Sequence, residues 1–323
     1  MFDRIVTHDD FDGVVSAALA GYFLEIGTVV FTGPGDINRS AVPTGPGDIV
    51  CDLPYPLSCG MWFDHHQANL EEIELRGLDP ASIPGRRSPE LSCARVIRDY
   101  FAGEFEIEPE IEDMVAQADR IDSFAYESVE DWRRMSPSAL IDRSIKLKSG
   151  RPAERRAYLK LLTAWLMDQS LEQVAGREEV ISRADEFEAA EQRMLEIIEK
   201  NMGFLDEAGE IILLDFTGHS RRMPVVKNLA QLQAPRGLAV LEVNSLFERG
   251  VKTNDLGLSM SMNIAGIQKG LEKDLGGIMR SLNIGSGHAG AASGTIRCKS
   301  KQEMLKQKKK VLDRILEIWQ SKC

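Results

Sequence analysis

Residues 4–13 read RIVTHDDFDG, an apolar and largely β-branched segment that runs directly into closely spaced polar residues. The first half, 4–8, predicts a short strand, since β-branched residues favour extended backbone. Alternate side chains of an extended backbone point to the same side, so His8, Asp10 and Asp12 would converge where that strand ends. One imidazole and two carboxylates on a rigid edge suit a hard divalent metal ion. The alternative is a solvated turn that only caps the following helix.

The segments after this motif alternate between helix and strand patterns. A broad apolar face over 13–26 predicts a helix, with Asp12 as its N-cap. Strands are expected over 28–32, 49–53 and 61–66, and polar Asp or His residues stand at the ends of the last two. Strands that alternate with helices favour a doubly wound, mostly parallel sheet, in which ligand sites lie at the carboxyl ends of the strands.

The rest of the chain divides into a helical part and a mixed part. Proline and glycine residues predict a loop over 67–90. Helical patterns then extend to residue 201, and a break follows over 203–209. We therefore expect a first domain over 1–203, with a helical connector at its end, and a smaller α/β domain over 204–323, with a cleft between the two. The expected helices cover 91–102, 108–118, 138–148, 153–175, 177–201, 225–232 and the segment from 301, and the expected strands of the second domain cover 210–216, 237–243, 256–262 and 295–298.

The composition narrows the class of protein. The 323 residues are enough for two domains, and 43% apolar and 28% charged residues are ordinary for a soluble globular protein. No apolar run approaches the roughly 20 residues that cross a membrane. The five cysteines form no CxxC pair and the N-terminus carries no export-signal pattern, so a cytoplasmic protein with reduced thiols is expected. The net charge of −11 argues against coating of long duplex nucleic acid.

The C-terminal segment departs from this acidic balance. Residues 295–323 carry nine Lys or Arg and three Asp or Glu, which gives a local balance of +6. A short anionic ligand could use such an end of the chain. The alternative is a solvated helix face with a lysine-rich turn.

Further polar residues stand at the expected strand ends. Asp52 closes one strand, and Asp64, His65 and His66 close the next. Two metal ions that share a bridging carboxylate need this mixture of Asp and His, and Asp52 is the natural bridge because it stands alone on its strand. The alternative for Asp52 is a strand-ending residue before Pro54. Two adjacent imidazoles in a chain with only five histidines are hard to attribute to packing.

Taken together, these motifs resemble those of the DHH phosphoesterase superfamily, whose namesake tripeptide matches Asp64-His65-His66. The resemblance spans both ends of the chain, in the order that the family follows. Ser286 departs from it, because the family usually has glycine there. The other matches are His8-x-Asp10-x-Asp12-Gly13 with the first motif, Val50-Cys51-Asp52 with the second, Ala118-Asp119 with the fourth, and Gly285-Ser286-Gly287-His288, followed by Ala291-Ala292-Ser293-Gly294, with the glycine-rich element of the DHH-associated C-terminal domain.

The resemblance implies a role for each matched residue. Two Mn²⁺ ions, with Mg²⁺ as the alternative, would share Asp52. His66 would be the catalytic residue that contacts the scissile phosphate, and Asp64 would orient the neighbouring imidazole. Asp122 is an alternative to Asp119 in the fourth motif. The implied metal ligands are His8, Asp10, Asp12, Asp52, His65 and Asp119, and the implied substrate-binding residues are Gly285, Ser286, Gly287 and His288.

The resemblance also implies the activity. It predicts a metal-dependent hydrolase of a phosphate ester in a short nucleotide, bisphosphonucleotide or oligonucleotide, similar to RecJ-like, nanoRNase-like and bisphosphonucleotide phosphatase-like proteins. An exopolyphosphatase-like or pyrophosphatase-like hydrolase is one alternative, and a nucleotide-binding or nucleic-acid-binding protein without turnover is the other. The expected partner is a small nucleotide or a short single-stranded oligonucleotide, no membrane is expected, and a homodimer is left open.

Overall fold

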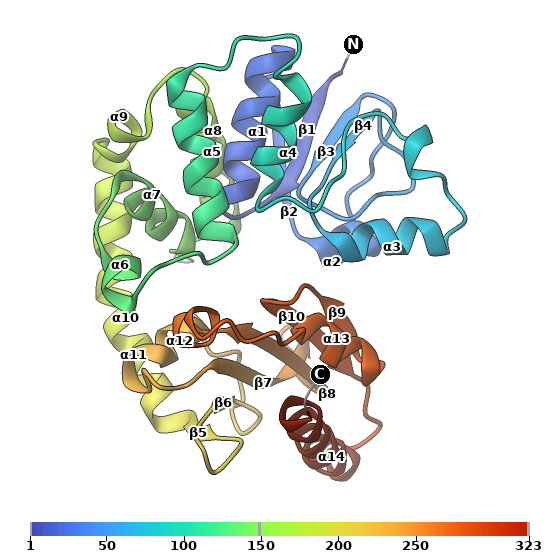
Figure 1. Ribbon diagram of the computed structural model, residues 1–323, viewed down its shortest axis with the longest axis vertical. Coiled ribbons are helices and arrows are strands. Elements are labelled where there is room, and N and C mark those ends of the chain that lie inside the picture. Colours follow the sequence, from blue (N-terminus) through green and yellow to red (C-terminus); the bar gives the residue numbers. More distant parts are fainter. Residues whose placement is uncertain (1, 148–149, 322–323) are drawn as a thin grey trace. The chain divides into compact units, whose positions relative to one another are not determined.

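The structure is a computed structural model that describes residues 2–147 and 150–321 (Figure 1). The chain folds as two compact units, one of Met1–Ala125 with Arg133–Glu188 and the other of Tyr126–Trp132 with Ala189–Cys323. The division lies inside helix α10 (Glu178–Asn201), earlier than the sequence suggests, because the C-terminal half of this helix packs Ile198 into the core of the second unit.

A parallel four-stranded sheet forms the centre of the first unit. Its strands are β1 (Arg4–His8), β2 (Val29–Thr32), β3 (Asp48–Cys51) and β4 (Met61–Phe63), in the spatial order β2-β1-β3-β4. β1 pairs in parallel with β2 and β3, and β3 pairs in parallel with β4. All four carboxyl ends therefore lie at one edge of the sheet, where the sequence analysis places the polar motifs.

Helices cover both faces of this sheet, so the predicted doubly wound arrangement is confirmed. Ile5 belongs to the large core that β1 shares with α1 (Phe11–Leu24), α4 (Cys93–Phe101) and α5 (Pro109–Asp122). The neighbouring residue, Val6, points into a smaller core on the other face, shared with α2 (Pro34–Asn38) and α3 (Gln67–Leu75). Figure 1 shows these two groups of helices on opposite sides of the sheet. Because both faces are covered, the strands are apolar throughout apart from their ends.

Two helical regions differ from the sequence prediction. The expected loop over 67–90 contains α3 and the short helix η1 (Pro80–Ser82), since proline first appears in this segment at residue 80. The expected helix over 153–175 is two helices, because Ser170 forms a capping box with Gln173 and starts a new one. The remaining helices of this part are α6 (Val129–Arg133), α7 (Pro137–Lys146), α8 (Pro152–Leu166) and α9 (Leu171–Ala175).

The second unit contains a mixed six-stranded sheet in the order β5-β6-β7-β8-β10-β9, in which only the β6–β7 pairing is parallel. One face packs against α13 and α14 and the other against the end of α10 and α11. The strands are β5 (Met202–Phe204), β6 (Ile211–Asp215), β7 (Ala239–Glu248), β8 (Val251–Met262), β9 (Gly285–Gly287) and β10 (Ala291–Ile296), and the helices are η2 (Lys227–Leu229), α11 (Ala230–Gln233), α12 (Ile264–Gln268), α13 (Leu275–Ser281) and α14 (Lys301–Gln320).

The central hairpin of this sheet is longer than predicted. β7 and β8 continue through polar residues to a two-residue turn at Arg249 and Gly250, both of which have positive φ angles. Such a turn matches the natural twist of paired strands. The four cysteines that the structure describes, Cys51, Cys59, Cys93 and Cys298, are free thiols. Among the described residues, every helix is too short or too polar to cross a lipid bilayer.

Gly13 permits the close approach of α1 to the end of β1, which can be tested by substitution. A Cβ atom at this position would lie 2.2 Å from the carbonyl oxygen of His8, whereas a Cβ atom on Gly27 would meet nothing within 4 Å. We expect Gly13→Ala to lower the free energy of unfolding by about 1–3 kcal/mol, because the backbone must shift. Urea unfolding followed by circular dichroism measures this, with Gly27→Ala as the control. Equal stability of the two variants would contradict the packing argument.

Candidate metal centre

Asp52 stands at the middle of the cluster of strand-end side chains. It follows β3 directly, and its backbone has a φ angle of 54°, which is unusual for a residue other than glycine. Its N–H group donates a hydrogen bond of 3.0 Å to the carbonyl oxygen of Phe63, which fixes this strained turn. The side chain of Asp52 is 2% exposed. Its Oδ2 lies 3.6 Å from Nδ1 of His8, and its Oδ1 lies 3.5 Å from Nε2 of His65.

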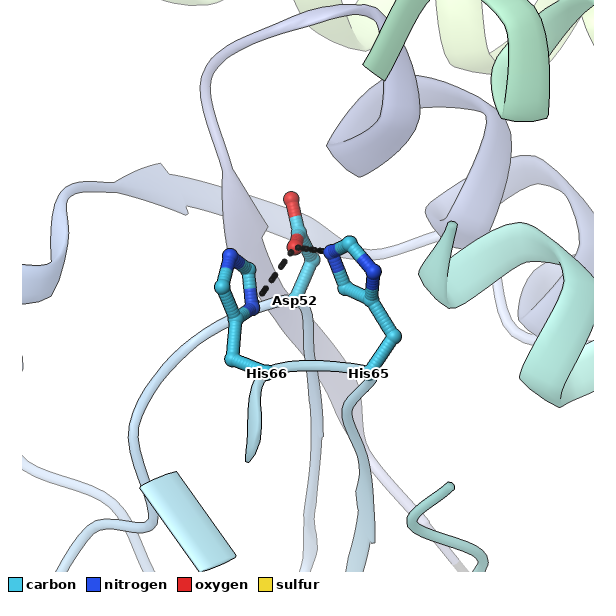
Figure 2. Close-up of side chains that lie close together, drawn as sticks. All are labelled: Asp52, His65 and His66. Carbon is cyan, nitrogen blue, oxygen red and sulfur yellow. Dashed lines mark ion pairs between the residues drawn. The ribbon is translucent and has the colours of Figure 1, made fainter. Parts of the chain in front are cut away.

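The two oxygens of Asp52 therefore face two different groups of donors. On one side are His8 and Asp10, whose Nδ1 and Oδ2 atoms are 2.6 Å apart. On the other side are the adjacent imidazoles of His65 and His66, which converge on Oδ1 in Figure 2. A carboxylate between two such groups has the placement that a bridging ligand needs.

Asp10, and not Asp12, caps helix α1, which corrects the sequence-based expectation. Oδ1 of Asp10 accepts a hydrogen bond of 3.0 Å from the N–H group of Gly13. The helix begins at Phe11, so Asp12 already lies in its first turn.

Asp12 is held instead by the N-terminus of α4. Its two oxygens accept hydrogen bonds from the N–H groups of Cys93 (2.8 Å) and Ala94 (2.9 Å). Free N–H groups at a helix start stabilise a buried anion, which explains how Asp12 can be 2% exposed.

The two imidazoles of the tripeptide 64–66 differ in their hydrogen-bond partners and in their exposure. Nδ1 of His65 lies 3.1 Å from the carbonyl oxygen of Glu90 and donates a hydrogen bond to it, so Nε2 is the nitrogen that faces the cluster and can bind a metal once its proton is displaced. Nδ1 of His66 lies 2.9 Å from Oδ1 of Asp64, whose other oxygen accepts from Asn69. The side chain of His65 is 8% exposed and that of His66 is 39% exposed. His66 therefore stands at the solvent side of the cluster, oriented by Asp64.

The structure brings Asp122, and not Asp119, to the cluster. Oδ2 of Asp122, the last residue of α5, lies 3.4 Å from Nε2 of His65. Asp119 lies one turn earlier, where its oxygens accept hydrogen bonds from the hydroxyl of Ser92 (2.6 Å) and from the guanidinium of Arg95 (2.7 and 3.0 Å). Since Ser92 caps α4, Asp119 braces the helix whose N-terminus holds Asp12.

The close packing of these charges shifts their protonation. Burial raises the pKa of Asp122 to about 7. The negative charge of Asp52 also raises this pKa, whereas the imidazole of His65 acts to lower it. Burial also raises the pKa of Asp12 well above its usual range. Burial lowers the pKa of His65, but Asp52, Asp12 and Asp122 outweigh it and raise that pKa to about 11. In the same way, Asp64 raises the pKa of His66 to about 9 against burial.

These donors fit a divalent metal. Two buried atoms that face each other, Oδ1 of Asp52 and Nε2 of His65, have no hydrogen-bond partner among the described residues. A cation between them would satisfy both, which buried polar atoms ordinarily require. Carboxylate oxygens and imidazole nitrogens are ligands for such ions. Three groups of side chains have donor atoms close enough to hold an ion: His8, Asp10 and Asp52; Asp12, His65 and Asp122; and Asp52, His65 and His66.

The predicted substrate-binding residues 285–288 lie in the second unit, on the edge strand β9 and directly after it. Glycine is required there, because a Cβ atom on Gly285 would lie 1.9 Å from the carbonyl oxygen of Ser293 on β10. Ser286 pairs with Ser293, and Nδ1 of His288 accepts a hydrogen bond of 3.1 Å from the N–H group of Gly290. This edge of the sheet is built of small side chains and exposed backbone.

One contact beside the cluster was not predicted from the sequence. Arg155 of α8 forms an ion pair with Asp9 and also donates a hydrogen bond of 2.7 Å to the carbonyl oxygen of Asp9. Asp9 lies between His8 and Asp10, so this pair fixes the loop that carries two cluster residues. No spacing signal joins residues 9 and 155, because they meet only in the folded chain.

No protein-family model matches the sequence, and neither does any curated protein sequence. Solved structures do match. The pGpG-specific phosphodiesterase PggH from Vibrio cholerae is 20% identical, with a TM-score of 0.68 over 98% of this chain and 99% of that chain. A DHH domain described as belonging to a family of ribosomal proteins is 14% identical, with a TM-score of 0.55 over 100% of this chain and 88% of that chain. RecJ from Thermus thermophilus, in complex with Mn²⁺, is 14% identical, with a TM-score of 0.50 over 97% of this chain and 52% of that chain.

These likenesses show the fold. The chain has the two-part α/β fold of DHH-domain proteins, and the resemblance inferred from the motifs is confirmed at this level.

Separate substitutions of Asp119 and Asp122 distinguish the roles of these two residues of α5. We expect Asp122→Asn to weaken Mn²⁺ binding by more than about tenfold, since even residues that only support metal ligands account for losses of that size. Asp119→Asn should lower the free energy of unfolding of the metal-free protein by about 1–3 kcal/mol, because the charged hydrogen bonds from Arg95 to Asp119 are lost. Calorimetric titration and urea unfolding measure the two effects. A larger loss of metal affinity in Asp119→Asn than in Asp122→Asn would reverse the assignment.

Metal binding should also release protons. Asp122, with a pKa of about 7, and the imidazoles with raised pKa values hold protons in the metal-free protein, and a metal must displace them. Affinity for Mn²⁺ should therefore rise between about pH 6 and 8. Titration calorimetry in buffers of different ionisation enthalpy counts the protons released. A pH-independent affinity without proton release would contradict the arrangement.

Proposed function

We propose that the chain is a metal-dependent phosphoesterase that hydrolyses a phosphate ester of a short nucleotide, with two Mn²⁺ ions in the strand-end cluster. The observation that carries this proposal is the placement of Asp52, whose two oxygens face separate groups of metal-binding side chains. One group, His8 and Asp10, would hold the first ion. The other group, Asp12, His65 and Asp122, would hold the second.

The charge of the cluster supports two divalent ions. Asp10, Asp12, Asp52 and Asp122 carry four negative charges when ionised, which two divalent cations would balance. Without them, the carboxylates would repel a phosphate group. When bound, the ions supply Lewis acidity and make hydroxide available near neutral pH. In hydrolysis, an oxygen from water forms a bond to phosphorus, the bond from phosphorus to the leaving oxygen breaks, and that oxygen takes up a proton.

His66 is the side chain that would contact the substrate. It is the more exposed of the two adjacent imidazoles, and Asp64 holds its Nδ1, so Nε2 is the nitrogen that remains for a ligand. An imidazolium that Asp64 stabilises can donate a hydrogen bond to a phosphoryl oxygen as negative charge builds there. Asp64 thereby acts through His66 and need not touch the substrate.

The second unit would supply substrate recognition. The exposed backbone of β9 and the glycines around it allow a phosphate or a nucleobase to approach closely, and His288 stands at the end of this strand. The name of the Vibrio cholerae phosphodiesterase gives pGpG as its substrate, and its structure matches nearly the whole of this chain. We therefore favour a linear dinucleotide among the short nucleotides.

Turnover of defined substrates tests the proposal. With Mn²⁺, the purified protein should hydrolyse pGpG to mononucleotides, and a 3′,5′-bisphosphonucleotide and polyphosphate are the comparison substrates. Release of phosphate from polyphosphate alone would favour the exopolyphosphatase-like alternative. Nucleotide binding with no turnover of any substrate would favour a binding protein.

Asp52→Asn tests the bridging role. The substitution keeps the shape of the side chain but removes the charge that both ions would share, so we expect activity to fall by more than about 100-fold, beyond the loss seen for residues that only support ligands. His288→Ala is the matched comparison and should raise KM while leaving Mn²⁺ content intact. Near-normal kcat in Asp52→Asn would refute the two-ion proposal.

A further inference from the structure

A pocket that is lined only by residues of the second unit contains an unusual concentration of positive charge. It has a volume of about 860 Å³ and is bounded by the end of α10, the first residues of β8 and the first half of α14. Four lysines line it, and Asp215 is the one carboxylate among the lining residues. The local balance is therefore 4 − 1 = +3 in a chain whose net charge is −11. The lysines are Lys200, Lys252, Lys301 and Lys308.

Two of these ammonium groups are fixed in place by the protein. Nζ of Lys252 donates hydrogen bonds to the carbonyl oxygens of Thr217 (2.6 Å) and His219 (2.8 Å). Nζ of Lys308 donates to Oδ2 of Asp215 (2.7 Å) and to the hydroxyl of Thr217 (2.8 Å). An ammonium group has three N–H donors, so each lysine keeps one for a ligand. Donors that are already ordered lose little entropy when an anion binds.

The other two lysines stand at the opening. Lys200 and Lys301 are exposed, and neither ammonium group forms a hydrogen bond or ion pair with any residue that the structure describes. Like charges gathered at one opening repel each other, and an anion would relieve that repulsion. The basic C-terminal segment noted in the sequence therefore supplies part of a pocket, and not only a solvated helix face.

The pocket also has an apolar wall, made of Met202, Leu213, Met304 and Leu305. Its volume lies in the range of small-molecule sites and exceeds what a single phosphate needs. A ligand that fills it must combine several negative charges with a flat or apolar portion.

This pocket is separate from the glycine-rich edge. Asn254 lines the pocket near the start of β8, whereas Ser261, near the other end of that strand, pairs with Ala291 beside the glycine-rich turn. Seven residues of extended strand separate the two positions, which corresponds to roughly 24 Å.

We propose that this pocket binds a nucleoside polyphosphate, with the phosphates on the four lysines and the nucleoside against the methionine and leucine side chains. The inference goes beyond the proposed hydrolase activity and does not depend on it. The pocket would then be a nucleotide site of the second unit that is separate from the strand-end cluster.

Binding of ATP to the full-length protein in EDTA tests this inference. Without divalent ions the carboxylates of the strand-end cluster repel phosphate, and a comparison of lysine variants by calorimetry then distinguishes binding in the lysine pocket from binding at the glycine-rich edge. Lys301→Glu reverses one charge at the opening and should weaken ATP binding by at least about tenfold. Lys310→Glu is the control, because Lys310 lies on the opposite side of α14 from the pocket. Salt screens most of the field of an exposed charge over that distance. This substitution should change the affinity by less than about twofold.

The parts of the ligand can be separated in the same assay. ATP should bind more tightly than either pyrophosphate or adenosine alone. Equal binding of pyrophosphate and ATP would overturn the nucleoside part of the proposal. Absence of ATP binding, or equal affinities in Lys301→Glu and the wild type, would overturn the site itself. Both results are independent of whether the metal-loaded protein hydrolyses pGpG.

Discussion

The fold holds several carboxylates, which repel each other when ionised, close together at one edge of a buried parallel sheet. Asp52 and Asp12 are almost fully buried, and Asp10 and Asp122 lie beside them. Repulsion between such groups is strong where water is excluded. The fold offsets part of it locally, through the N–H groups that start α4 and the imidazoles that surround Asp52. What remains is the attraction for external cations that the proposed function uses.

The surrounding core explains why these side chains cannot move apart to relieve the repulsion. Asp52 occupies a strained backbone conformation that is tied to Phe63 at the end of the next strand. α4 cannot withdraw from Asp12, because Asp119 holds Ser92 and Arg95 of that helix while α5 packs in the same core. Strain of this kind persists only where the rest of the structure maintains it. The packing of the parallel sheet and its helices therefore offsets the electrostatic cost of the acidic cluster.

The sequence predicted most of this arrangement because the relevant signals are local. The spacing of two residues correctly grouped His8 with Asp10, whereas Asp12 lies in the other group of donors because the helix already begins at Phe11. Apolar strands that end in polar residues located Asp52 and the adjacent histidines. The choice between Asp119 and Asp122 could not be made, because both lie on one helix and differ only in which turn faces β3. The pair of Arg155 with Asp9 had no local signal. β7 and β8 were predicted too short, since their ends are polar and lack the apolar pattern that marks a strand.

The two proposed anion-binding sites carry side chains of opposite charge. In the first unit the cluster is dominated by carboxylates, so apart from the hydrogen bond from His66 the attraction for phosphate would come from the cations that these carboxylates hold. In the second unit lysines provide the positive charge directly, and Asp215 and the carbonyl oxygens around Lys252 orient these lysines without neutralising the group. A site of the first kind can activate water as well as hold phosphate, because cations lower the pKa of water. A site of the second kind can only hold it, which suits recognition and not hydrolysis. The same chain can therefore separate binding from chemistry by the sign of the charge that it provides.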